Sequence, residues 1–184
     1  MTLTGGFTAE QAASTLSLQC TNVKNPRSQA TTAGFEFQLT TSADVLMYQL
    51  QNAITLTMTS TSTLSTFTVA AASGINGEST TYTFSFTPGE NIIAGDKVTV
   101  TPPSTVTFTG TTCAGTANLA SSLTCALSGT SIVMTVALSR LRYLAAGDAG
   151  QVHTFTVDGV TNAPSLTTTD TFTVAISDSA DAAM

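Results

Sequence analysis

Charged residues are scarce in this sequence, and their scarcity excludes several classes of protein. Asp, Glu, Lys and Arg make up 9% of the 184 residues, against about 25% in an ordinary soluble domain. Five residues are basic and the formal net charge is −6, which argues against nucleic-acid binding because phosphates require clustered Lys and Arg. Tryptophan is absent, and His153 is the single histidine. We expect His153 on the surface of a strand, because no nucleophile motif accompanies it.

Other functional signatures are also missing. No paired-carboxylate, phosphate-loop or metal-ligand pattern occurs, so we predict that the protein is not an enzyme and uses no cofactor. No window of 18 or more apolar residues occurs, so we predict no membrane span. The first ten residues lack the basic start and apolar stretch of a signal peptide. No Asn-x-Ser/Thr sequon is present, so any attached glycan must be O-linked.

Hydroxyl-bearing residues take the place of the missing charges. The chain has 39 Thr and 19 Ser, while 42% of its residues are hydrophobic. The apolar residues recur at every second position, which is typical of half-buried strands, and no window has a helical face. In residues 82–86, aromatic side chains alternate with hydroxyls. The expected strands are 14–20, 34–40, 54–60, 63–70, 80–87, 97–102, 105–109, 123–127, 131–138, 152–158 and 170–176.

Turn signals separate these segments. They include Pro88-Gly89, Ser128-Gly129 and Asp158-Gly159, and residues 139–151 are the one place where a short helical turn is expected. Many short strands without intervening helices predict an all-β sandwich of the immunoglobulin type, with seven to nine strands between about 54 and 178.

An internal repeat suggests how the chain is organised. Residues 25–47 and 162–184 align without a gap at an offset of 137, with nine identical positions. Such a repeat predicts a segment of a tandem array, with the C-terminal part of one unit at 1–53 and a complete unit at 54–184. Beyond Met184 we expect the array to continue with residues similar to 48–50. The open first unit needs strands from another chain or from upstream sequence.

Several motifs then suggest a family. A Tyr-Thr-Phe strand at 82–84 is followed by an Ile-x-Ala-Gly-Asp turn at 92–96, a Pro-Ser-x-Val-x-Phe strand at 103–108 and a Gly-Val-x-Asn-x-Pro-Ser turn at 159–165. This pattern resembles the tandem Ig-like repeats of large secreted, fibre-forming proteins of algae and other protists, which have relatives among bacterial surface proteins. It covers roughly 63–180 and reappears in part at 22–44. The chain departs from it at 25–27, where the basic residues Lys24 and Arg27 lie near Cys20.

The cysteines have alternative interpretations. The resemblance implies a disulfide between Cys113 and Cys125, which would stabilise the fold by about 3 kcal/mol in the chain-entropy model. The alternative is a pair of reduced thiols in a cytosolic protein. Cys20 aligns with Val157, which favours a small buried side chain. It is otherwise a candidate for a bond to a cysteine in another chain or in the missing part of its own unit.

Carboxylates and hydroxyls supply the remaining candidate sites. Asp178 and Asp181, with Glu90 and Asp96 in nearby turns, form a weak candidate calcium site, although turn capping is the favoured role for such aspartates. The threonines are candidates for O-glycosylation, or are simply good strand formers. The candidate glycosylation positions are Thr57, Thr59, Thr61, Thr63, Thr109, Thr111, Thr112, Thr167, Thr168 and Thr169.

Together these features predict a structural subunit of an extracellular, O-glycosylated fibril built from end-to-end repeats. Its expected partners are copies of itself and the attached glycans. The alternative is a cell-surface adhesin or carbohydrate-binding stalk module, for which the absence of Trp is unfavourable. An ice-binding surface of Thr ladders is a weaker third interpretation.

Overall fold

The computed structural model describes residues 19, 21–59, 64–110, 112–116, 118–119, 123–137, 149–165 and 170–184. These residues are all-β and contain no helix. The expected strand at 14–20 and most of the expected helical turn at 139–151 lie outside them. The strands are β1 (Phe35–Thr40), β2 (Leu46–Ile54), β3 (Thr66–Ala71), β4 (Ser79–Thr87), β5 (Lys97–Thr101), β6 (Thr107–Phe108), β7 (Cys113–Gly115), β8 (Leu123–Ser128), β9 (Ser131–Val136), β10 (His153–Thr161) and β11 (Thr173–Ser177).

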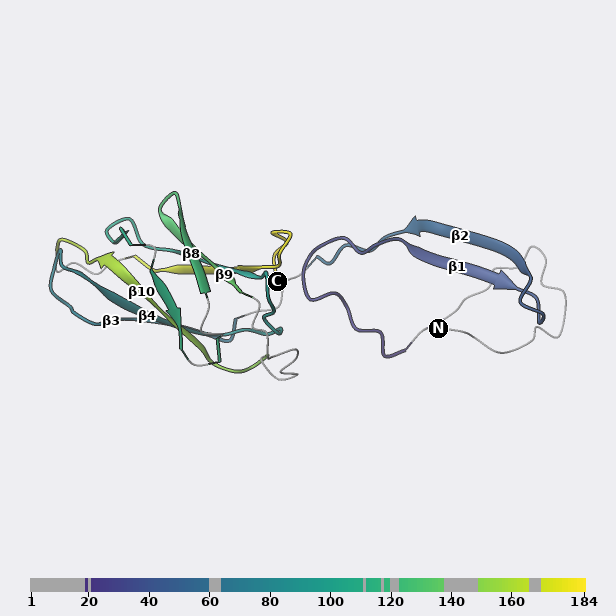
Figure 1. The fold of residues 1–184 in the computed structure, drawn as a ribbon, viewed down its shortest axis with the longest axis horizontal. Helices are drawn as coiled ribbons and strands as arrows, with labels where there is room; N and C mark the ends of the chain where they lie inside the picture. Colours follow the sequence, from purple (N-terminus) through teal and green to yellow (C-terminus); the bar gives the residue numbers. More distant parts are fainter. Residues whose placement is uncertain are drawn as a thin grey trace.

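The strands form three antiparallel sheets. Strands β1 and β2 pair only with each other, as a hairpin. A second sheet has the order β3-β4-β10-β6, with β7 also paired to β10, and the third has the order β11-β5-β9-β8. Figure 1 shows the hairpin extending away from the two larger sheets, with the C-terminus between them. The two larger sheets face a common core, an arrangement compatible with a β-sandwich.

Aromatic side chains dominate that core. The expected alternation in β4 is confirmed, because Tyr82, Phe84 and Phe86 are buried while the hydroxyl residues between them are partly exposed. Phe84 stacks on Phe155 of the neighbouring strand β10 with ring centroids 5.0 Å apart. Aromatic pairs at this distance add to the free energy gained from area burial alone.

The predicted position of His153 on a strand surface is wrong. His153 is 1% exposed and stacks on Phe86, with ring centroids 5.6 Å apart. It is two residues before Phe155, and the period of two therefore directs its side chain to the same inner face. The alternation of β10 overrides the polarity of the imidazole.

The signal at Asp158-Gly159 marks a bulge within β10 and not a turn between strands. The pairing of β10 with β4 shifts register between Val157 and Val160, and Gly159 has a φ of 71°, which favours glycine. Gly110 packs so closely here that an added Cβ would lie 2.4 Å from the carbonyl oxygen of Asp158. The bulge separates the part of β10 that pairs with β7 from the part that pairs with β6.

Three points of the strand assignment also need correction, and the first is that β2 (Leu46–Ile54) was not expected from the sequence. The strand expected at 54–60 does not form: β2 ends at Ile54, and residues 55–59 contain no strand. The amide of Thr32 donates to the carbonyl of Leu56 at 2.8 Å, so this alternating segment packs beside its own hairpin. Leu56 therefore lies beside the segment that leads into β1. The three-residue strand β7 is too short to show an alternation and was not predicted.

Cys113 and Cys125 lie at disulfide-bonding distance, with Cα atoms 6.1 Å apart. Cys113 is in β7, which pairs with β10, whereas Cys125 is in β8, which pairs with β9. The bridge therefore connects the two sheets that enclose the core, which extends what the sequence suggested.

Candidate assembly interface

One turn occurs twice in the structure, 137 residues apart. After β1, the amide of Thr41 donates to the carbonyl of Val45 at 2.9 Å and the amide of Asp44 donates to the carbonyl of Thr41 at 3.0 Å. After β11, Asp178 bonds to Ala182 at 2.9 Å and Asp181 to Asp178 at 3.0 Å in the same way. The matching residues Asp44 and Asp181 both have positive φ, at 57° and 65°. The two turns therefore share one backbone conformation.

The first residue caps the turn in both places. Oγ1 of Thr41 accepts from the amides of Ala43 and Val45 at 3.3 and 3.2 Å. Oδ1 of Asp178 accepts from the amides of Ala180 and Ala182 at 2.8 and 3.0 Å. The pairing that follows also matches, since Thr40 pairs with Leu46 and Ser177 with Ala183. The difference is that Asp178 brings a second carboxylate oxygen and a charge to its turn.

A segment that precedes the hairpin contacts the end of the sandwich through an arginine. The Arg27 guanidinium donates to both carboxylate oxygens of Asp96, with Nη1 2.6 Å from Oδ2 and Nη2 2.7 Å from Oδ1. Asp96 is fully buried, and Oδ2 also accepts from the amide of Ile93 at 2.8 Å. This two-pronged pair with a buried carboxylate is the strongest kind of side-chain contact described here.

Further contacts surround the arginine. The Ser28 hydroxyl donates to Oδ2 of Asp178 at 2.6 Å, and the amide of Gln29 donates to the carbonyl of Ala183 at 2.8 Å. Lys24 lies 3.3 Å from the carboxylate of Glu90, but its side chain is 81% exposed, so this ion pair contributes little. The contact with the sandwich therefore depends mainly on Arg27, Ser28 and Gln29.

The pKa values reflect these contacts. The hydrogen bond with Asp96 raises the pKa of Arg27, against a smaller opposing effect of burial. The hydrogen bond from Ser28 is the main cause that lowers the pKa of Asp178 below 3.8. Both groups are therefore held in their charged forms by partners across this interface.

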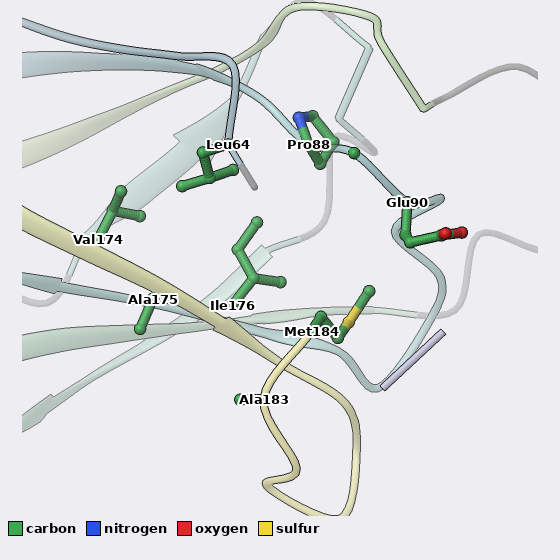
Figure 2. Close-up of a pocket in the computed structure, with 9 residues that line it drawn as sticks. Leu64, Pro88, Glu90, Val174, Ala175, Ile176, Ala183 and Met184 are labelled. Atoms are coloured by element: carbon green, nitrogen blue, oxygen red, sulfur yellow. The ribbon is translucent and has the colours of Figure 1, made fainter. Parts of the chain in front are cut away.

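The edge of the third sheet lies beside the same interface. Strand β11 ends the order β11-β5-β9-β8. In the described part of the chain, its outer edge bonds to residues 183–184, through the Ser177–Ala183 bridge and through the Met184 amide, which donates to the carbonyl of Ile176 at 3.0 Å. An apolar pocket of about 240 Å³ opens next to it. Figure 2 shows Leu64, Val174 and Ile176 around this space, with Met184 at its end. In the hairpin, the matching strand β1 is covered along its length by β2.

The hairpin has apolar side chains that nothing in the described structure covers. Many of its hydrophobic residues are exposed. Figure 1 shows the hairpin apart from the two larger sheets, which enclose the aromatic core. Tyr48, at 68%, is the most exposed aromatic residue among them. Exposed apolar side chains in such number are typical of an interaction site. The exposed set comprises Phe35, Phe37, Val45, Leu46, Met47, Tyr48, Leu50, Ile54 and Leu56.

The structure describes only some of the candidate sites. Thr57, Thr59, Thr109 and Thr112 are exposed, although Thr109 donates to the carbonyl of Gly159 at 2.6 Å. Cys20 and the other candidate threonines, namely Thr61, Thr63, Thr111, Thr167, Thr168 and Thr169, lie outside the described residues.

The carboxylates of the weak calcium site have other partners. Asp178 caps its own turn and accepts from Ser28, while Asp181 lies 2.6 Å from the amine of Lys97. Asp96 binds Arg27, a contact that the sequence did not reveal. The available signal was Arg27 itself, which stands where the second copy of the repeat has Pro164.

Comparison with known proteins adds no relative. No protein-family model and no curated protein matches the chain. Among the described residues, no helix is long and apolar enough to cross a membrane.

Proposed function

We propose that this chain is a structural subunit of an extracellular, O-glycosylated fibril built from end-to-end Ig-like β-sandwich repeats. The observation that carries the proposal is the turn that follows both β1 and β11, with the same hydrogen bonds and the same next pairing. One copy lies on an open hairpin and the other at the edge of a larger pair of sheets. A tandem array produces such a relationship, because each unit repeats the same supersecondary structure.

The exposed hairpin supports association with further units. An isolated two-stranded hairpin is at best marginally stable in water, and this one leaves Phe37 and Leu50, which face each other across its strands, about half exposed. Packing against sheets of a neighbouring unit would remove these side chains from water. A surface rich in hydroxyls and poor in charge is suited to such repeated contacts, and the cysteine pair is suited to an oxidising, extracellular location.

The proposal is tested by the mass of the protein in solution. We expect multi-angle light scattering to give masses that rise with concentration in multiples of 18.8 kDa. Phe37→Lys with Leu50→Lys should shift the mass towards the monomer, because burying two ammonium groups opposes association. Leu127→Lys on β8, which is 40% exposed outside the hairpin, is the matched control and should leave association unchanged. A monomer at every concentration would overturn the proposal.

A carbohydrate-binding stalk module is the second candidate, favoured by the exposed ring of Tyr48 in β2. Exposed aromatic rings can stack against the apolar faces of sugars. A saturable glycan-array signal that Tyr48→Ala abolishes would support this function. No signal with any glycan would exclude it.

A further inference from the structure

We propose that the end of the sandwich around Asp96 is an arginine-specific binding site for an Arg-Ser-Gln segment, and that this site orders neighbouring units. In this chain, residues 27–29 occupy it. We name it the Asp96 socket and define it by Asp96, Asn91, Asp178, Ala183 and Met184. That the occupant belongs to a neighbouring unit rests on the proposed function, whereas the binding site itself does not.

The socket is shaped for a guanidinium group. Nη1 and Nη2 of Arg27 each reach a different oxygen of Asp96, and Nη1 also lies 3.4 Å from the carbonyl oxygen of Asn91 and 3.3 Å from Sδ of Met184. A lysine ammonium is a point charge and cannot make two parallel bonds to one carboxylate. The carboxylate is fully buried, so leaving it without its cation is costly.

The residues after the arginine set the register of the bound segment. Ser28 is 8% exposed and its hydroxyl reaches Asp178, while the Gln29 amide bonds to the backbone of Ala183. A segment with arginine but without the following hydroxyl and amide would lose both contacts. The site therefore recognises a short sequence as well as a single charge.

The two copies of the repeat are not interchangeable at this contact. The segment that matches residues 27–28 is Pro164-Ser165, which has no guanidinium, and the turn that matches Asp178 has Thr41, which has no carboxylate. The arginine belongs to the first copy, and the complete socket belongs to the second. This asymmetry gives the contact a direction, because only one order of units brings arginine and socket together.

A peptide titration tests the site in the full-length chain. Arg27→Ala removes the guanidinium that anchors the chain's own segment in the socket. A synthetic peptide of residues 22–31 is then added, and its binding is followed by calorimetry. We expect saturable one-to-one binding, and binding at least about tenfold weaker when lysine replaces arginine in the peptide. The wild-type chain should bind the peptide far more weakly, because its own segment competes at high effective concentration.

Two further variants make the outcome decisive. Arg27→Lys is titrated in parallel, so that the test does not depend on one variant folding. Asp178→Thr keeps the turn cap that Thr41 provides in the other copy, and it should weaken peptide binding by removing the acceptor for Ser28. Equal binding of the Arg and Lys peptides, or no binding to either Arg27 variant, would overturn the proposal.

The two proposals fail separately. Peptide binding by a chain that stays monomeric would support the Asp96 socket as a binding site and overturn the proposed fibril function. Concentration-dependent association without peptide binding would support the proposed fibril function and overturn the proposal that the Asp96 socket orders its units.

Discussion

Phe35 and Phe172 occupy matching positions in the two copies of the repeat, yet their surroundings differ. Half of the Phe35 side chain is exposed at the start of the hairpin. Phe172 instead packs against the core, with its ring centroid 5.7 Å from that of Phe84. Met47 and Met184 repeat the contrast, at 53% and 8% exposed. The same residue in the same local structure is buried only where a second sheet stands opposite it.

Apolar residues at every second position put their side chains on one face of a strand. Burial of that face depends on a partner surface, and the described part of the hairpin has none. The free energy that each side chain contributes should therefore differ between the two regions, although their sequences are similar.

The largest expected difference in stability is between alanine variants of these two phenylalanines. Phe172→Ala should lower the free energy of unfolding by about 3 kcal/mol, since it removes a ring packed in the core. Phe35→Ala should change it by less than about 0.5 kcal/mol, as is usual for exposed positions. Urea denaturation followed by circular dichroism measures both. Equal losses would mean that the hairpin is buried as deeply as β11.

Loss of the disulfide should have an effect of similar size, confined to the sandwich. Cys113→Ser, Cys125→Ser and the double variant should each lower the free energy of unfolding by about 3 kcal/mol, because each frees the same loop in the unfolded chain. The cysteine substitutions should accelerate amide hydrogen exchange more in β7 and β8 than in the hairpin. Wild-type protein that unfolds identically with and without reductant would show that the thiols are not bonded.

Acid should produce the smallest effect, which is expected at the turn that Asp178 caps. The pKa of Asp178 lies below 3.8 in the folded protein. Its contribution is therefore fully present above pH 3.8 and is lost as the pH falls through the folded-state value. The Gln29 amide, which bonds to Ala183, should then exchange faster and shift in NMR spectra.

The matched turn supplies the control for that titration. Thr41 does not ionise in acid, so the hydrogen bonds that its Oγ1 accepts from the amides of Ala43 and Val45 should persist where those to Asp178 are weakened. Asp178→Thr should abolish the step at Gln29 while keeping the turn. A step that persists in this variant would place the titrating group elsewhere.

Sequence patterns predicted much of the fold, and the failures have identifiable causes. The alternation in residues 82–86 correctly placed the core aromatics. The same alternation, continued along β10, puts His153 on the inner face with Phe155, whereas the absence of a nucleophile motif says nothing about burial. The strand at 54–60 was misplaced because its Thr-x-Thr pattern suits a strand but the segment finds its hydrogen-bond partners at Thr32. The bulge at Gly159 looks like a turn in sequence, since glycine serves both purposes.

The candidate interface was less predictable. Arg27 was visible as a basic residue in an otherwise acidic chain, and Asp96 as part of a turn. Their contact joins positions 69 residues apart, and no local pattern encodes such a separation.

By itself, the sequence determined the strand periodicity, the all-β class and the match between residues 25–47 and 162–184, because these depend on local side-chain order. Tertiary structure alone decided that Phe172 packs against the core while Phe35 is half exposed, and that the Asp96 carboxylate receives Arg27. Burial and ion pairing are properties of surfaces brought together by the whole chain. A strand can specify its apolar face without specifying what will cover it.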